Sequence, residues 1–237
     1  MHRFANPGRF MRLAGAVTPW TGAATVLLFA AGLYYGLLAS PADYQQGDSV
    51  RIMYVHVPAA TLGLAVYVFM AAMSFIALVW RHPLADVAAR AASPLGAAFT
   101  LIALVTGSIW GKPTWGTWWV WDARLTSFLI LFFLYLGHMA LANAFDEPSR
   151  GARAAAILAL VGVVNIPIIK FSVDWWNTLH QPSSIGAMET AIDPTMMRPL
   201  LLMWGAFLGF FVTLLLVRMK SDLLAARLRA AQLARAA

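Results

Sequence analysis

Six long apolar segments divide the chain, and each is close to the ~20 residues that a helix needs to cross a bilayer. We predict an all-α integral membrane protein with one membrane domain, residues 1–237, whose six transmembrane helices lie at about residues 18–40, 56–80, 92–110, 124–145, 153–173 and 198–218. The fifth segment is the weakest, and Pro167 within it predicts a kink, where Asn165 could bond a backbone group freed by the proline. The tail, residues 219–237, has Ala, Leu and Arg at helical spacing. It is expected to form an amphipathic helix at the inner surface or in the cytoplasm.

Composition supports a membrane protein and limits its partners. Hydrophobic residues make up 61% of the 237 residues and charged residues 11%, against about 45–50% and 25% in soluble domains. The net charge of +7 does not indicate nucleic-acid binding, because the basic residues are spread singly along the chain. The basic, apolar N-terminus resembles a signal peptide, but its apolar run is long for one, so a retained first helix is expected.

The distribution of Lys and Arg predicts the orientation of the bundle. Twelve of them lie in the N-terminal segment, the second and fourth loops and the C-terminal tail, against five on the other side. Because basic residues favour the cytoplasmic side, both termini are predicted to be cytoplasmic. The three remaining loops, at about residues 41–55, 110–122 and 172–198, then lie on the outer side of the membrane.

Two absences exclude several kinds of chemistry. The chain contains no Cys, which excludes thiol–disulfide exchange, thiolate metal sites and covalent haem attachment through a CxxCH motif on this chain. It also lacks the GxxxxGK[ST] pattern of a phosphate-binding loop. Any dependence on ATP must therefore come from a partner.

The most unusual stretch is Trp110–Asp122, which reads WGKPTWGTWWVWD. It is predicted to be an outer loop between the third and fourth helices, bent by Gly111, Pro113 and Gly116. Its five tryptophans are expected to form one flat aromatic surface: Trp110, Trp115, Trp118, Trp119 and Trp121. Asp122 is expected chiefly to cap the fourth helix, although it could also pair with Arg124 or orient a ligand.

Two of the five histidines bracket this stretch on the outer side of the membrane. His56 stands at the outer end of the second helix and His180 in the third outer loop. Two imidazoles beside an aromatic surface suit axial ligation of haem iron. The alternative is that His56 only caps a helix and that His180 is a loop residue with no role as a ligand. His138, inside the fourth helix, is expected to make a hydrogen bond between helices, and His82 to be a solvated loop residue.

The run WGKPTWGTWWVWDARLTS resembles the WGxxWxWD signature of a haem-handling superfamily. With HVPAA around His56, LHQP around His180 and six predicted spans, the whole chain is similar to the CcmC family of cytochrome c maturation system I. This resemblance implies that haem b, bound non-covalently and transiently, is held by His56 and His180 as axial ligands. The haem platform would be formed by Trp110, Trp115, Trp118, Trp119, Trp121 and Asp122.

The resemblance also implies a location in the bacterial inner membrane, with the haem site facing the periplasm, together with partners and a role. The family works with the ATP-binding-cassette proteins CcmA and CcmB and with CcmD, and delivers haem to the periplasmic chaperone CcmE. The chain is then a delivery protein and not an enzyme. Lys112, Arg124, Arg51 and Arg198 are on the correct side to meet the haem propionates. Two alternatives are a haem-containing quinone oxidoreductase, which would need paired histidines within helices, and a haem-translocating permease, which would need a polar path across the bilayer.

Overall fold

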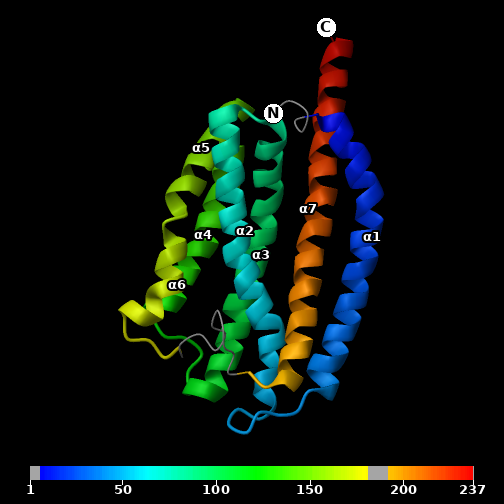
Figure 1. The fold of residues 1–237 in the computed structure, drawn as a ribbon. Coiled ribbons are helices and arrows are strands. Elements are labelled where there is room, and N and C mark those ends of the chain that lie inside the picture. Colours follow the sequence, from blue (N-terminus) through cyan, green and yellow to red (C-terminus); the bar gives the residue numbers. More distant parts are fainter. Residues whose placement is uncertain (1–5, 181–191, 237) are drawn as a thin grey trace.

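The computed structural model describes residues 6–180 and 192–236, which form a helical bundle (Figure 1). Within these residues, six helical stretches are long and apolar enough to cross a membrane, which confirms the six predicted spans. The helices are α1 (Pro7–Leu33), α2 (Met53–Trp80), α3 (Pro83–Trp115), α4 (Ala123–Asn143), α5 (Pro148–Gly162), α6 (Asn165–Trp175) and α7 (Pro194–Ala236). A π-helix, η1 (Tyr34–Ala39), continues α1, and a 3-10 helix, η2 (Asp48–Ile52), precedes α2.

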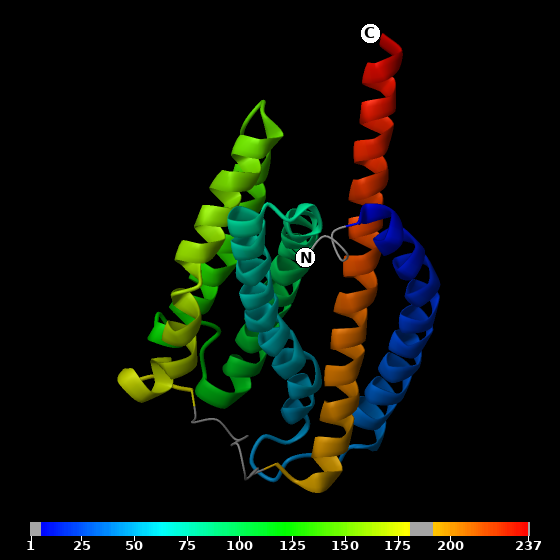
Figure 2. The same ribbon diagram turned by 45° about the horizontal axis from the view of Figure 1, so that its top comes forward.

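The bundle has a central pair of helices with further helices on either side. The central pair is α2 and α3, which pack extensively on each other, while α1 packs on α7 to one side and α4 packs on α5 and α6 to the other. Figures 1 and 2 show this arrangement from two directions. The core between these layers contains large, fully buried side chains from four helices, among them Tyr67, Met70, Leu131, Tyr135 and Met203.

Several helices extend beyond their predicted limits. The first begins at Pro7 rather than near residue 18, because the Asn6 side chain accepts a hydrogen bond from the backbone N–H of Arg9 at 3.1 Å and caps it. The third runs from Pro83 to Trp115 rather than from 92 to 110. Hydrophobicity therefore located the spans but not the capping residues outside them.

The fifth span is interrupted, as Pro167 predicts. It consists of α5 and α6, separated at Val163 and Val164, and Pro167 has no N–H to donate to the carbonyl of Val163 four residues earlier. Asn165 does not bond a backbone group freed by Pro167, as was expected. Its side-chain amide donates to the backbone carbonyl of Ser127 in α4 at 2.9 Å, and so ties the interrupted span to its neighbour.

The C-terminal tail is not a separate surface helix, which corrects one predicted alternative. It is the last part of α7, which runs unbroken to Ala236 and projects beyond the other helices (Figures 1 and 2). Near the end of the bundle, the Nε of Arg218 donates to the backbone carbonyl of Ala91 at 3.2 Å and fixes α7 to α3. The tail therefore continues along the direction of α7.

Candidate functional site

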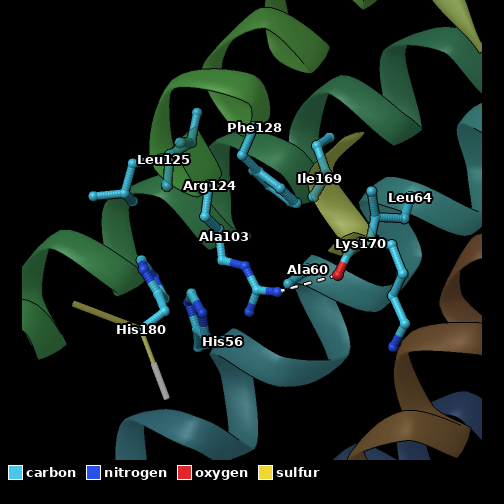
Figure 3. Close-up of a pocket in the computed structure, with 11 residues that line it drawn as sticks. His56, Ala60, Leu64, Ala103, Arg124, Leu125, Phe128, Ile169, Lys170 and His180 are labelled. Atoms are coloured by element: carbon cyan, nitrogen blue, oxygen red, sulfur yellow. Dashed lines mark hydrogen bonds between the residues drawn. The ribbon is translucent and has the colours of Figure 1, made fainter. Parts of the chain in front are cut away.

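At the end of the bundle predicted to face the periplasm, four helices and one loop enclose a cavity of about 240 Å³. Its polar lining consists of His56 from α2, Arg124 from α4, Lys170 from α6 and His180 from the loop after α6. The rest of the lining is apolar: Ala60, Leu64, Ala103, Leu104, Leu125, Phe128 and Ile169. Figure 3 shows the two imidazoles beside the Arg124 guanidinium. The structure thus brings together the two histidines singled out in the sequence.

His56 is held in one tautomer by a threonine on the neighbouring helix. Its Nδ1 lies 3.1 Å from the Oγ1 of Thr106, and that hydroxyl donates its proton to the backbone carbonyl of Ile102 at 2.6 Å. Since the hydroxyl proton is engaged, the threonine oxygen accepts and Nδ1 donates. The Nε2 of His56 therefore carries a lone pair. The ring of Trp110 meets the imidazole nearly at right angles, with centroids 5.7 Å apart.

His180 is held by a carboxylate in the same way. Its Nδ1 lies 3.2 Å from the Oδ2 of Asp122, and the hydroxyl of Thr178 donates to the same carboxylate oxygen. Because a carboxylate only accepts, Nδ1 donates, and Nε2 again carries the lone pair. Trp115 packs against the ring with a centroid distance of 4.7 Å. A metal-bound histidine commonly has such a carboxylate or hydroxyl partner on its second nitrogen.

The protonation states of this pair follow from its surroundings. Burial lowers the pKa of His180 below the ordinary 6.5, and Arg124 lowers it further, although the Asp122 carboxylate partly offsets both effects. Burial alone would raise the pKa of Asp122, but hydrogen bonds from Thr178, from the backbone N–H of Leu125 and from His180 outweigh it, so the net shift is downward. Near neutral pH the imidazole is therefore neutral and the carboxylate is charged.

Asp122 has two roles at once. Its Oδ1 accepts from the backbone N–H of Leu125 at 2.7 Å, which confirms the prediction that it caps α4. Its Oδ2 faces His180, as described above. Among the described residues it forms no ion pair with Arg124, whose guanidinium instead donates to Ser172 Oγ at 3.2 Å and to the Lys170 carbonyl at 3.5 Å. The Asp122 carboxylate thus links the start of α4 to the loop after α6, which carries His180.

The tryptophans do not form the flat surface that was expected. Trp110 and Trp115 belong to the last turns of α3, not to a loop, and α3 ends at Gly116, whose φ of 76° suits glycine. The rings of Trp119 and Trp121 are inclined by 76° to each other. Trp118 and Trp121 point outward, with 57% and 74% of their surface exposed. Trp110 and Trp115 therefore support the histidines, and none of the five tryptophans lines the cavity.

Comparison with known proteins gives the site its context. The family model described as "Heme exporter protein C" matches residues 1–234. The chain belongs to this family. It is 59% identical over 233 residues to the heme exporter protein C of Bradyrhizobium diazoefficiens, covering 98% of this chain and 88% of that protein. It is 52% identical over 224 residues to that of Escherichia coli strain K12, covering 94% of this chain and 91% of that protein.

A mitochondrial relative supports the same context. A putative cytochrome c biosynthesis ccmC-like mitochondrial protein of Marchantia polymorpha is 52% identical over 186 residues, covering 78% of each chain. Membership of the heme exporter protein C family assigns the chain a role in haem handling for cytochrome c maturation. With its six apolar spans, it is a multi-pass protein of the inner membrane.

Two of the four basic residues considered for the propionates are bonded elsewhere in the chain and do not line the cavity. Arg51 donates to the backbone carbonyls of Leu37 and Ser40 and pairs with Asp48 at 3.2 Å. Lys112 donates to the carbonyl of Gly116 at 3.0 Å. Arg198 lies in α7 and does not line the cavity.

Arg124 does line the cavity, and so does Lys170, which the sequence placed on this side without assigning it to the ligand. The one sign of this in the sequence was that Lys170 is a charged residue near the outer end of the predicted fifth span, residues 153–173.

The remaining histidines have no part in this site. His138 is 1% exposed, and its Nδ1 has no hydrogen-bond partner among the described residues, so the predicted bond between helices is wrong. His82 is only partly exposed, and its Nδ1 is buried, which also differs from the solvated loop residue that was expected. His2 lies outside the described residues.

Proposed function

We propose that the chain binds haem through the Nε2 atoms of His56 and His180 and presents it, at the periplasmic face, to the chaperone CcmE. The observation that carries this proposal is that the imidazole rings of His56 and His180 are held in the same way, each by a hydrogen bond from its Nδ1. Each Nδ1 donates to a fixed oxygen, and each residue borders the same cavity, so both Nε2 lone pairs are available to iron. Imidazole is a common axial ligand of haem iron.

The remaining lining residues fit haem as a transient cargo. Apolar side chains such as Leu64 and Phe128 suit the porphyrin, and the cationic groups of Arg124 and Lys170 suit its propionates. The cavity of about 240 Å³ is smaller than the ~300–1,000 Å³ typical of pockets that bury a whole ligand. A haem bound here is therefore only partly enclosed, with an edge left accessible to a partner.

Delivery, rather than chemistry on the haem, is the role that this chain supports. It has no Cys and no phosphate-binding loop, so covalent attachment and ATP hydrolysis fall to other proteins. We propose that CcmA, CcmB and CcmD form a membrane complex with it and that CcmE takes the haem. A quinone oxidoreductase of the cytochrome b kind is disfavoured, because His56 faces a loop histidine rather than a second histidine within the spans.

Transfer in a purified system tests this proposal. The full chain is loaded with haem in detergent and mixed with haem-free CcmE and its membrane partners. We expect haem to leave the chain and to appear covalently attached to CcmE, as detected by mass and by haem staining after denaturation. Haem that reaches CcmE at the same rate when the chain carries both His56→Ala and His180→Ala would contradict the proposal.

The pH dependence of haem binding follows from His180. Because ligation needs the neutral ring and burial lowers the pKa of His180 below 6.5, protons compete with iron at a lower pH than they would at an exposed histidine. We expect the break in a plot of haem affinity against pH, below which the affinity falls, to lie below pH 6.5. A spectrophotometric haem titration of the purified chain at stepped pH measures this, and a break above pH 6.5 would argue against neutral, buried His180 as a ligand.

Gly107 in α3 provides space for the His56 ring. A Cβ atom built on this residue would lie 2.9 Å from the His56 Cε1, so Gly107→Ala must displace the imidazole. We expect haem affinity to fall roughly 10-fold or more, in line with other changes that misorient a metal-bound histidine. Titration of purified Gly107→Ala with haem measures the loss.

Gly205→Ala is the matched control, because the nearest atom to its Cβ is the Leu28 side chain at an ordinary 3.5 Å. Its haem affinity should equal that of the wild type. If Gly107→Ala also keeps full affinity, the described position of His56 is not the one that binds haem.

A further inference from the structure

A second, larger cavity lies at the opposite end of the bundle, which the Lys and Arg distribution assigns to the cytoplasm. Its volume is about 660 Å³, and it lies between the end of α2, the start of α3 and the first turns of α5. Figure 1 shows that the turn between α2 and α3 and the start of α5 share this end of the molecule. Nothing in the proposed haem delivery uses this cavity.

The cavity carries positive charge from two arginines whose side chains have no partner among the described residues. Arg81 and Arg153 both line it, and among the described residues neither side chain makes a hydrogen bond or an ion pair. The one acidic lining residue, Asp86, is already paired with Arg90 at 3.4 Å. Two guanidinium groups therefore face the cavity without a partner.

His82 adds a polar group that lacks a partner. It lines the cavity, and its Nδ1 is buried without a hydrogen-bond partner among the described residues. A buried nitrogen of this kind needs an acceptor or donor from elsewhere. His82 also precedes Pro83, the first residue of α3, whose N-terminal N–H groups favour an anion.

The backbone at Arg81 supports the same interpretation. Arg81 ends α2 in the left-handed conformation, with φ of 50° and ψ of 40°, and it is the one non-glycine residue with positive φ among those described. Glycine is the usual residue at such a helix end. An arginine here brings its guanidinium to the cavity at the expense of backbone strain.

The position of the cavity favours a lipid head group, rather than a free ion, as the anionic group that it would bind. Trp80, half exposed, precedes Arg81 and is typical of the membrane–water interface. Other lining residues are apolar, including Leu78 and the half-exposed Ile157, and these suit the start of an acyl chain. Basic pockets between transmembrane helices on the cytoplasmic side are suited to lipid head groups.

We propose that this cavity binds the phosphate of an anionic phospholipid from the inner leaflet, through Arg81, Arg153 and His82. The guanidiniums contact the phosphate oxygens, and the His82 Nδ1 donates to one of them. The apolar residues contact the glycerol backbone and the first methylenes of the lipid. This site is independent of the proposed haem site at the other end of the bundle.

Native mass spectrometry of the full chain in detergent, supplemented with phosphatidylglycerol or phosphatidylcholine, tests the proposal. We expect the wild type to retain phosphatidylglycerol at least 10-fold better than phosphatidylcholine, and the double variant Arg81→Gln/Arg153→Gln to lose this preference. Arg150→Gln is the matched control, because Arg150 lies one helical turn away, is exposed and pairs with Glu147 at 3.0 Å; it should keep the preference. Arg153→Lys, which keeps the charge, should keep most of it.

Three results would overturn the proposal. The first is equal retention of both lipids by the wild type, and the second is an unchanged preference in the double variant. The third is displacement of phosphatidylglycerol by millimolar inorganic phosphate, which would make free phosphate the ligand. Haem titration at His56 and His180 serves as the folding check, because the double variant should bind haem as the wild type does; if it does not, the preference is read from Arg153→Gln against Arg153→Lys.

Discussion

Replacement of His56 or His180 by alanine is expected to lower haem affinity by roughly 100-fold or more, because loss of a supporting residue alone typically costs 10–100-fold. Each single variant should leave iron with one protein ligand and change its spectrum from six-coordinate low-spin to five-coordinate. Both variants should remain in the membrane, because neither histidine belongs to the core of large, fully buried side chains. Haem titration and absorption spectra of the purified variants measure the change.

His82→Ala is the matched control for this prediction, because His82 lies at the other end of the bundle. It should bind haem with the affinity and spectrum of the wild type. Wild-type occupancy and ligation in both His56→Ala and His180→Ala would rule out the assigned ligands. A loss in only one of them would reduce the site to a single axial histidine.

Asp122→Asn is expected to separate the two roles of this carboxylate. Asparagine caps helices about as well as aspartate, so the hydrogen bond to the backbone N–H of Leu125 should persist and thermal stability should change little. The amide nitrogen then faces the Nδ1 of His180, and two donors cannot bond. We expect haem affinity to fall about 10–100-fold while the melting temperature stays close to that of the wild type.

Asp122→Ala should lose the cap as well, at a further cost of about 1 kcal/mol in stability. Asp43→Asn is a suitable control, because Asp43 Oδ1 accepts only backbone N–H bonds in a different outer loop, from Gln45 at 2.9 Å and Gln46 at 2.8 Å. If Asp122→Asn binds haem as the wild type does, the carboxylate does not set the orientation of His180.

The sequence predicted the spans and the pairing of the histidines, because neither depends on knowing the side-chain contacts. Apolar runs of bilayer length identify helices whatever their tertiary contacts. His56 and His180 could be paired because topology alone places the outer ends of spans and the outer loops together. The capping role of Asp122 was likewise readable, since an acidic residue before an apolar run is a usual helix start.

What sequence could not provide is the direction of side chains. The Gly, Pro and Trp residues of Trp110–Asp122 are typical of a loop, and a loop was predicted there. In the structure, however, α3 continues through Pro113 to Trp115 and is capped by Gly116. The contact of Asp122 with His180 joins residues 58 positions apart and depends on how the loop after α6 folds back. The fixed tautomer of His56 needed Thr106, a residue on another helix that no motif singles out.

The most direct measurement for the central claim is electron paramagnetic resonance of the full chain loaded with ferric haem. Two imidazoles on iron, from His56 and His180, predict a low-spin six-coordinate signal characteristic of bis-histidine ligation. That signal should be lost in the double alanine variant and kept in His82→Ala. A high-spin five-coordinate signal from the wild type, or a low-spin signal unchanged by removing both histidines, would contradict the account.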